Sequence, residues 1–519
     1  MKTAGPGPQV LIVGAGPAGL YAAGELARHG IGARLVEREP TPHREARATA
    51  IQPAVLELLD RAGVLDRFLK VGVPIRGVRF LGPDLEEIAA GTFAGIDCAH
   101  EHQCSLPQWS TEAILTAHLE ELGGQVERGI EVVAVEEAAD GLRVALHHAS
   151  GEAENISVQY LLGAGGAHSI TRSSMHSVLD GATYGGQFVV ADARAKLPSK
   201  PEEAKIHFGP VGLVLMAPLP DERWIMFVNV DGSTDTAPGE RELAALVDQR
   251  VGRDAGIHDV NWTSCFRMHN RIAPRLADGR RFLLGDAGHL SSPFGGEGLN
   301  TALMDAGDVA WKLALVVRGA AKPSLLDSFA IERGLADRHV LEVSDQVHIT
   351  VMGLVEAYAT GRKPEFPAPD AARELAFQRS RTMLDVSYAG SPLVGEHVTS
   401  GPCPAPAPGS RFPDRARLSG TGHHLLIFGD ADPQRLRARW SALVEVMDGK
   451  GSGFDATRAG VPEGGAVLVR PDGMIGFRAS PADGPGLDAL DAHLASYLVP
   501  NHPATAASAS SLSPTASIG

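Results

Sequence analysis

The chain has 519 residues, of which 47 are Lys or Arg and 62 are Asp or Glu, so its net charge is −15. This acidity argues against binding to nucleic acid or to an anionic membrane surface, because both carry negative charge. With 44% hydrophobic and 21% charged residues, the composition is typical of a globular protein with several domains. It excludes a disulfide-stapled miniprotein.

The four cysteines, Cys98, Cys104, Cys265 and Cys403, form no C-x-x-C pair. We therefore expect no disulfide framework and no metal site. Glycines interrupt the apolar stretch near the N-terminus, and no cleavage pattern of a secretory signal follows it. The longest apolar runs stay short of the roughly 20 residues that a bilayer requires. These features predict a cytoplasmic protein without a transmembrane helix.

The chain begins with a βαβ unit. The apolar run QVLIVG at residues 9–14 predicts a buried strand, and apolar positions at helical spacing between residues 18 and 30 predict the helix that follows. A second strand is expected at residues 33–37. Another helix, starting near Pro53, has apolar residues at i, i+3, i+4 and i+7.

The middle of the chain reads mainly as strands. Alternating residues between about 125 and 165 predict a hairpin or meander, and residues 187–230 predict a mostly antiparallel sheet. The strand RFLLGD and a helix from Thr301 to about Arg318 then return to α/β character. The first domain is therefore expected to be discontinuous, with the middle sheet inserted into it.

The C-terminal third begins with a segment rich in Pro, Gly and Ala, which marks a boundary, and continues as alternating strands and helices. The last residues are rich in Ser, Ala and Thr and predict disorder. The expected division is a discontinuous first domain (1–80, 101–176 and 277–360), an inserted sheet domain (81–100 and 177–276), a linker (361–410), a C-terminal domain (411–500) and a disordered tail (501–519).

The motif GAGPAG, residues 14–19, lies between the first strand and its helix. Its glycines allow a tight turn and a close approach of the backbone, and the N-terminus of the helix faces the pyrophosphate of a dinucleotide. Glu37 ends the next strand, about 20 residues further on, where a carboxylate accepts hydrogen bonds from a ribose diol. The pattern predicts a dinucleotide-binding site.

A second motif covers residues 285–314 and starts GDAGHLSSPFGGEGLN. Asp286 follows an apolar strand, where its carboxylate can bind sugar-like hydroxyls. The glycines at 295, 296 and 298 form a loop that can pass close to a flat ring. The helix that starts near Leu299 presents free N–H groups and a partial positive charge, which suits the anionic edge of a reduced flavin.

Together the two motifs resemble the flavoprotein monooxygenases of the aromatic hydroxylase class, the relatives of para-hydroxybenzoate hydroxylase and phenol hydroxylase. The C-terminal segment LVRPDG is similar to the thioredoxin-like domain of phenol hydroxylase and of bacterial polyketide and rifampicin-type hydroxylases. The implied fold class is α/β, or α+β overall. It comprises a Rossmann-like FAD-binding domain, an inserted mostly antiparallel substrate-domain sheet and a C-terminal thioredoxin-like domain.

The resemblance also implies site residues. Those placed along non-covalently bound FAD are Gly14, Gly16, Pro17, Ala18, Gly19, Glu37, Arg38, Arg47, Gln108, Asp286, Pro293, Gly298, Leu299 and Asn300. Candidates for the lining of the substrate chamber are Phe208, Leu215, Trp224 and Phe227, each of which can equally be a core residue. No catalytic residue is identified. Pro293 and His289 are candidates, and a structural hydrogen-bonding role is the alternative for His289.

The sequence departs from the family at one segment. The family has an Asp-Gly pair and an Arg where this chain has Gly165, Gly166 and His168, although Arg172 is retained. Because the family associates that Asp with contacts to the cofactor and to NAD(P)H, the change puts the manner of nicotinamide use in doubt.

The activity that the resemblance implies is hydroxylation of an aromatic compound, a polycyclic polyketide or another phenol, as in antibiotic biosynthesis. NADPH or NADH would reduce the FAD, and O2 would form a flavin C4a-hydroperoxide as the oxygen donor. The alternatives are Baeyer–Villiger oxygenation of a polyketide ketone and a flavoprotein that has lost NAD(P)H use. A monomer or homodimer is expected, with a small aromatic substrate as the partner.

Overall fold

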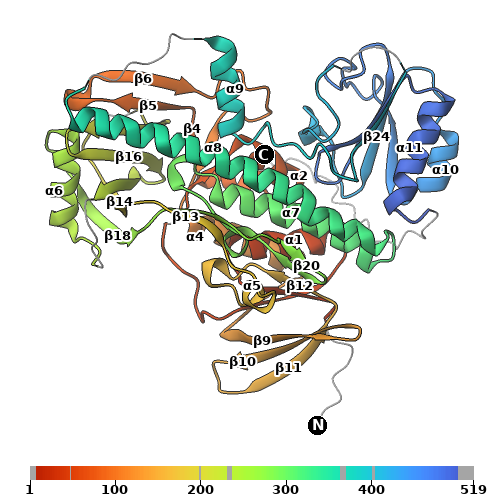
Figure 1. Ribbon diagram of the computed structural model, residues 1–519, viewed down its shortest axis with the longest axis horizontal. Coiled ribbons are helices and arrows are strands. Elements are labelled where there is room, and N and C mark those ends of the chain that lie inside the picture. Colours follow the sequence, from red (N-terminus) through yellow and green to blue (C-terminus); the bar gives the residue numbers. More distant parts are fainter. Residues whose placement is uncertain are drawn as a thin grey trace, which may run out of the picture.

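The computed structural model describes residues 8–46, 48–197, 200–230, 236–362, 370–399 and 404–500. Arg47, Cys403 and the predicted disordered tail lie outside the described residues. Figure 1 shows a large body crossed by the long helix α8 (Asp327–Ala359), with the C-terminal domain at one side. The described part of the chain has the mixed α/β architecture that the sequence predicts.

The central sheet of the first domain has six strands among the described residues, in the order β20-β21-β12-β1-β2-β8. All neighbouring pairs are parallel except β20 with β21. The strands are β1 (Val10–Val13), β2 (Ala33–Glu37), β8 (Val126–Arg128), β12 (Tyr160–Gly163), β20 (Ala277–Asp278) and β21 (Arg281–Leu283). The helices of this domain are α1 (Pro17–Arg28), α2 (Pro53–Arg61), α3 (Leu65–Val71), α4 (Gln108–Glu121), α5 (Ile170–Ser174) and α7 (Gly298–Val317).

The parallel strands bring the candidate site together. Loops at the carboxyl ends of β1, β2, β12 and β21 lie at one edge of the sheet, which is where open α/β sheets bind ligands. The short helical turns in and around these loops are η2 (Gly166–His168), η3 (Gly285–Ala287) and η4 (Pro293–Gly295). Residues distant in the sequence therefore meet at this edge.

Three small sheets surround the central one. The first is the predicted meander, β9 (Ile130–Ala138), β10 (Gly141–His148) and β11 (Ala153–Val158), which lies at the bottom of Figure 1. In the second, β7 (Gln103–Ser105) lies between β3 (Ala50–Ile51) and β4 (Val73–Ile75). In the third, β19 (His269–Ile272) lies between β13 (Asp180–Thr183) and β22 (His289–Leu290).

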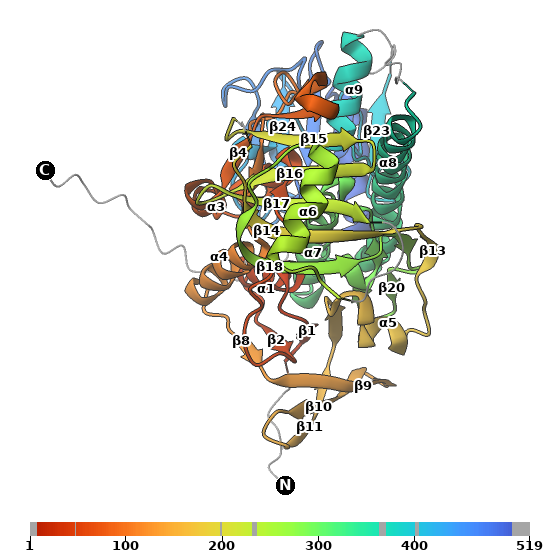
Figure 2. The ribbon, with the colours of Figure 1, turned by 90° about the vertical axis from the view of Figure 1, so that its left-hand side faces the viewer.

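The inserted domain is a sheet of seven described strands in the order β18-β14-β17-β16-β15-β5-β6, antiparallel except for β15 with β5. Its strands are β5 (Gly77–Leu81), β6 (Glu87–Thr92), β14 (Gln187–Arg194), β15 (Glu203–Gly209), β16 (Gly212–Leu219), β17 (Arg223–Val230) and β18 (His258–Phe266). Helix α6 (Glu240–Val251) covers its outer face, as Figure 2 shows, and α8 packs on the strands β15 and β16. Alternate residues of each strand therefore face α6 or the first domain.

The C-terminal domain is a mixed five-stranded sheet, within the described residues, flanked by two helices. Its elements are β23 (Gly395–Val398), β24 (His423–Phe428), β25 (Val444–Asp448), β26 (Gly465–Val469), β27 (Ile475–Ser480), α10 (Gln434–Trp440) and α11 (Gly484–Tyr497). The domain is joined to the first one by buried charges. Arg415 Nε donates to Glu57 of α2 at 2.7 Å, and Arg470 Nη2 donates to Glu332 of α8 at 2.8 Å.

The elements refine the domain boundaries that the sequence suggests. Strand β5 begins at Gly77, so the seven-stranded sheet takes in residues placed before the boundary at 81. The segment 361–410 contains helix α9 (Ala371–Arg381) and β23, which pairs with β27. The C-terminal sheet therefore begins before residue 411. The remaining short helical turns are η1 (Pro83–Leu85), η5 (Pro323–Leu326) and η6 (Arg415–Arg417).

Candidate cofactor site

The turn after β1 requires glycine at two positions, Gly14 and Gly19. Gly14 has φ of +103°, and a Cβ there would lie 2.4 Å from the carbonyl oxygen of Ala164. A Cβ on Gly19 would lie 1.9 Å from the carbonyl oxygen of Gly14. Both glycines thus let β1, α1 and the segment after β12 pack together, which is one of the roles that the motif predicts.

Gly16 is different, because no described protein atom explains why it is a glycine. A Cβ built on it meets nothing within 4 Å, and its backbone is extended. It is the N-cap of α1, which begins at Pro17, receives no side-chain cap and has no acidic residue in its first turn. The open space lies at the positive end of a helix with free N–H groups, which fits the pyrophosphate of FAD.

Glu37 lies at the carboxyl end of β2, as predicted, and helps to build the glycine turn. Its Oε2 accepts a hydrogen bond from the Ala15 N–H at 2.8 Å, and its Oε1 accepts one from the Glu39 N–H at 3.0 Å. Each carboxylate oxygen can still accept from a ribose hydroxyl. Arg38 is exposed and pairs with Glu39 at 3.3 Å.

Gln108 begins α4, and its side chain donates to Oε1 of Glu112, one helical turn away, at 2.9 Å. Burial raises the pKa of Glu112, although the hydrogen bond from Gln108 opposes the shift. The sequence reading did not single out Glu112. Arg47, the other residue expected along the cofactor, lies outside the described residues.

The predicted ribityl-binding residue, Asp286, lies in the turn η3 directly after the end of β21 and is exposed. Gly285 before it has φ of +57°, and a Cβ there would lie 2.7 Å from Cβ of Ala302 on α7. Ala18 of α1 lies beside the same glycine. The structure thus brings Asp286 to the same edge of the sheet as the glycine turn.

The loop after η4 is held by Asn300, which is completely buried. Its Oδ1 accepts from the Gln52 N–H at 2.7 Å, and its Nδ2 donates to the carbonyl oxygens of Ala50 and Gly296 at 2.8 and 2.6 Å. Asn300 therefore fixes the loop through its side chain. The backbone N–H groups in the first turn of α7 stay available for the flavin ring that the sequence predicts there.

That first turn contains two more of the expected residues. Gly298 and Leu299 open α7, and Pro293 opens η4 after Ser292. The helix has no side-chain cap at its N-terminus, so its partial positive charge is available to an anionic ring edge. The residues around the expected flavin position fit the cofactor.

Glu297, the N-cap residue of α7, is a buried acid that the sequence reading missed. It is 1% exposed, and neither carboxylate oxygen has a hydrogen-bond partner among the described residues. Burial raises its pKa, while the Arg381 guanidinium, 3.6 Å away, acts in the opposite direction. No pattern in the sequence marks this acid as buried, because Arg381 comes from the distant helix α9.

Aromatic side chains connect the flavin loop to the inserted sheet. The ring of Phe294 lies edge-on to Phe188 at 5.5 Å, Phe188 lies 6.3 Å from Phe266, and Phe266 lies edge-on to Phe227 at 6.3 Å. Of the predicted lining residues, Phe227 belongs to this chain of rings. Phe208 and Leu215 pack in the same cluster as Phe188 and Phe294.

Trp224 is not part of this arrangement. It is three residues from Phe227 on β17, and therefore points to the opposite face of the sheet. There it packs with the apolar residues of α6, and Lys205 lies over its ring. The structure therefore separates Trp224 from the other three predicted lining residues.

The segment that departs from the family pattern lies between the two halves of the site. Gly165 has φ of −77°, whereas Gly166 has φ of +71°. Arg172 donates to the carbonyl oxygen of Ala287 at 2.9 Å and to that of Ala167 at 2.6 Å. The retained arginine therefore ties this segment to the turn that carries Asp286.

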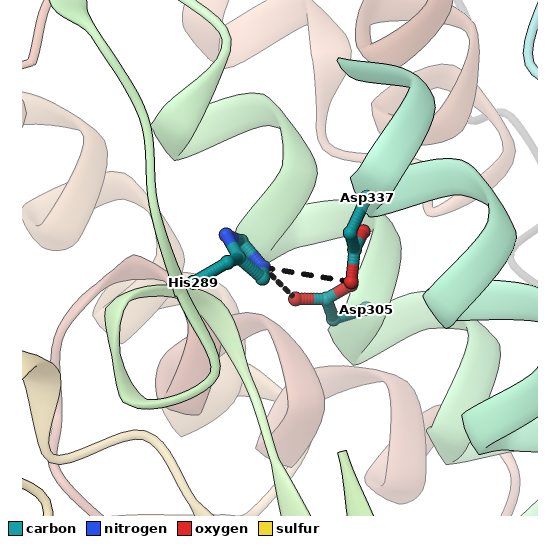
Figure 3. Close-up of side chains that lie close together, drawn as sticks. All are labelled: His289, Asp305 and Asp337. Carbon is teal, nitrogen blue, oxygen red and sulfur yellow. Dashed lines mark hydrogen bonds and ion pairs between the residues drawn. The ribbon is translucent and has the colours of Figure 1, made fainter. Parts of the chain in front are cut away.

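His289, the histidine considered as a catalytic candidate, is 3% exposed. Its Nε2 lies 2.8 Å from Oδ2 of Asp305 and 3.8 Å from Oδ2 of Asp337, as Figure 3 shows. Arg333 donates to both carboxylates at 2.7 Å. Asp305, Arg333 and Asp337 were missed by the sequence reading. The signal for Asp305 was an acid inside the mostly apolar helix α7, whereas Arg333 and Asp337 belong to α8, which carries many charged residues.

Comparison with known proteins agrees with this geometry. Residues 8–344 match the FAD binding domain family, and residues 391–499 match the aromatic-ring hydroxylase C-terminal family. The chain is 31% identical to 6-methylpretetramide 4-monooxygenase of Streptomyces rimosus, over 96% of each protein.

Two solved structures are also similar. The anhydrotetracycline hydroxylase OxyS of Streptomyces rimosus has 29% identity and a TM-score of 0.73, with 95% of this chain and 99% of that one covered. The flavin-dependent monooxygenase PieE, solved with FAD and substrate, has 25% identity and a TM-score of 0.77, with 94% and 99% covered. Within the described residues, no helix is long and apolar enough to cross a membrane. The chain belongs to the FAD-dependent aromatic-ring hydroxylases and is a flavoprotein monooxygenase.

Proposed function

We propose that this monooxygenase hydroxylates a polycyclic aromatic substrate of the polyketide or phenolic type, and that it consumes NADH or NADPH and O2. The observation that carries the proposal is the line of aromatic rings from Phe294, in the flavin loop, to Phe227 in the inserted sheet. Flat apolar substrates pack well against such rings. The similarity to enzymes named for 6-methylpretetramide and anhydrotetracycline supports the same substrate class.

The protein's part in the reaction is to hold the cofactor and to exclude water. The open N-terminus of α1 at Gly16 would hold the pyrophosphate, Glu37 the ribose and Asp286 the ribityl chain. The chemistry that bound FAD would supply is the acceptance of a hydride from the reduced nicotinamide and the activation of O2 for transfer to the aromatic ring. The N-terminus of α7 stabilises negative charge at the flavin.

The apolar inner face of the inserted sheet then serves two purposes. It binds the substrate ring, and it keeps water from the activated oxygen. Without this protection the activated oxygen would be released as hydrogen peroxide. Phe208, Leu215 and Phe227 contribute to this face, whereas Trp224 supports the sheet from behind.

The test is a screen of polycyclic phenols and anthraquinones for stimulated NADH and NADPH oxidation by the FAD-loaded enzyme, with product mass and hydrogen peroxide measured together. We expect a compound that accelerates oxidation and gains one oxygen atom while little peroxide forms. NMR of the product separates ring hydroxylation from a lactone, because both add one oxygen. A lactone, or the absence of nicotinamide oxidation with every compound, would contradict the proposal.

We also infer a monomer or homodimer in the reducing cytoplasm. The free thiols of Cys98, Cys104 and Cys265 support a reducing compartment. Size-exclusion chromatography with light scattering measures the oligomeric state, and a larger assembly would contradict this inference.

A further inference from the structure

The turn that carries Asp286 is held on both sides by charged side chains. The Gly285 N–H donates to Oδ2 of Asp305 at 2.9 Å, on the α7 side. The Ala287 carbonyl oxygen accepts from Arg172 at 2.9 Å, on the other side. Asp286 itself stays exposed between these two anchors. The backbone on both sides of Asp286 is therefore fixed by these two side chains.

Asp305 belongs to a buried network of two acids and two cations. Its Oδ2 lies 2.8 Å from Nε2 of His289, and its Oδ1 accepts from Arg333 at 2.7 Å. Arg333 also donates to Oδ1 of Asp337 at 2.7 Å. Figure 3 shows the histidine of β22 and the two carboxylates of α7 and α8 converging. Arg333 and His289 together can balance the two carboxylates, so the group forms an ion network and not a cation site.

We propose that His289 is a positioning residue: buried against Asp305, it orients that carboxylate, which holds the Gly285 turn so that Asp286 meets the ribityl chain of FAD. The inference rests on the proposed place of Asp286 at the cofactor and is independent of the substrate. It gives His289 a role in cofactor binding and leaves it out of the chemical step.

The surroundings of His289 favour its protonated form. Burial alone would lower its pKa, but the carboxylates of Asp337 on α8 and Asp305 on α7, together with Asp286 in its own loop, raise that pKa to about 9. Arg333 pairs with the same two carboxylates, Asp305 and Asp337, at 2.7 Å. Because the folded pKa exceeds the ordinary value of about 6.5, the stabilisation that the charged imidazolium supplies is present at neutral pH and is lost as the pH rises through about 9.

The chain offers a matched pair of variants for the test. Asp305→Asn weakens the acceptor of the Gly285 N–H, whereas Asp308→Asn changes an equally buried acid on the same helix, which binds Lys312 at 2.7 Å. Hydrogen exchange of residues 284–290 in the cofactor-free chain measures directly how firmly the turn is held. FAD affinity, measured by quenching of flavin fluorescence between pH 6 and 10, reads the consequence.

We expect Asp305→Asn to speed exchange at residues 284–290 and to weaken FAD binding by about tenfold to a hundredfold, whereas Asp308→Asn does neither. The wild type should lose affinity as the pH passes about 9. His289→Gln keeps a hydrogen-bond donor without the charge, so it should remove this pH step and bind FAD better than His289→Ala.

Three results would overturn the proposal. Exchange at residues 284–290 that is unchanged in Asp305→Asn removes the positioning role itself. Equal losses of FAD affinity in Asp305→Asn and Asp308→Asn, each in proportion to lost stability, reduce the network to a structural one. Normal FAD affinity in Asp286→Ala, with faster exchange still present in Asp305→Asn, leaves the turn's anchor intact but removes its link to the cofactor.

Discussion

The two ends of the cofactor site are built by different means. At the glycine turn, the site consists of backbone: Gly14 and Gly19 allow close packing, and Gly16 leaves space at a helix N-terminus. At the flavin end, the loops are held by buried polar side chains, with Asn300 and Asp305 bonding to segments distant in the sequence.

This difference affects how each end responds to mutation. Where two backbone segments are in direct contact, there is no room for a side chain. A substitution there is therefore expected to abolish FAD binding completely. Where several hydrogen bonds hold the site, a substitution removes one of them. FAD affinity is therefore expected to fall by degrees. Substitutions at the two ends should therefore give effects of different size and shape.

The largest effect is expected at the glycine turn. Gly14→Val places a side chain against the Ala164 carbonyl at a φ of +103°, which costs about 1–3 kcal/mol from the backbone conformation alone. The variant should be destabilised and purify without FAD. Gly16→Ala, by contrast, should keep the stability of the cofactor-free chain and lose FAD affinity.

Flavin absorbance per chain and the melting temperature of the cofactor-free proteins measure both effects. Full FAD occupancy in Gly14→Val would show that this turn is not part of the cofactor site. Unchanged FAD affinity in Gly16→Ala would show that the open space at α1 is not where the pyrophosphate binds.

The next largest effect belongs to Asp286→Ala. Because Asp286 is exposed, we expect little change in stability, but the loss of hydrogen bonds to sugar hydroxyls should weaken FAD binding by about 1–3 kcal/mol. A titration of the cofactor-free chain with FAD measures the dissociation constant. An unchanged constant would contradict the ribityl role.

A smaller, pH-dependent effect is expected from Glu297→Gln. The folded pKa of Glu297 is raised, so the unfolded chain binds fewer protons than the folded one above about pH 4.5 and stability falls as the pH rises. The amide has no such dependence and should stabilise the protein at pH 8, with little effect at pH 4.5.

Thermal or urea unfolding at the two pH values checks this prediction, and Glu342→Gln, an exposed acid on α8, is the control for general charge effects. An equal gain at both pH values would show that the effect does not come from the titration of Glu297. A loss at pH 8 would mean that the carboxylate is ionised and stabilised by Arg381.

The sequence was sufficient to predict the local structure at the glycine turn, but it was not sufficient to predict the side-chain contacts at the flavin end. The βαβ unit, the glycine turn and the place of Glu37 follow from residues 9–37, because strand, turn and helix are local there. The positions of Asp286 and the loop before α7 also follow from a contiguous motif. The partners of Asn300, Asp305 and Glu297 depend on contacts with Gln52, Arg333 and Arg381, and no local pattern encodes them.

Strand alternation explains why Trp224 lies apart from the other candidate lining residues of the inserted sheet. Phe227 and Trp224 are three positions apart, so they occupy opposite faces as soon as β17 is known to be regular. The sequence predicts the strand but does not say which face is turned toward the cofactor, because both faces are apolar and covered.

The smallest effect on folding, and the sharpest test of how the two ends are coupled, concerns Gly165. It lies beside Gly14, and its segment is tied by Arg172 to the turn of Asp286. With φ of −77° and a built Cβ no closer than 3.8 Å to Ser169, Gly165→Asp should change stability by less than about 0.5 kcal/mol. Gly166→Asp is the control, because its φ of +71° should cost about 1 kcal/mol.

Restoring the family's carboxylate at residue 165 should speed flavin reduction, if that group helps to organise nicotinamide contacts. Anaerobic stopped-flow reduction by NADPH, with and without substrate, measures the rate at full FAD occupancy, and Gly165→Asn separates the charge from the size of the side chain. A faster rate in the Asp variant alone assigns the effect to charge. An unchanged rate would mean that this chain organises nicotinamide use through other residues, and that Arg172 joins the two ends of the site without help from an acid at residue 165.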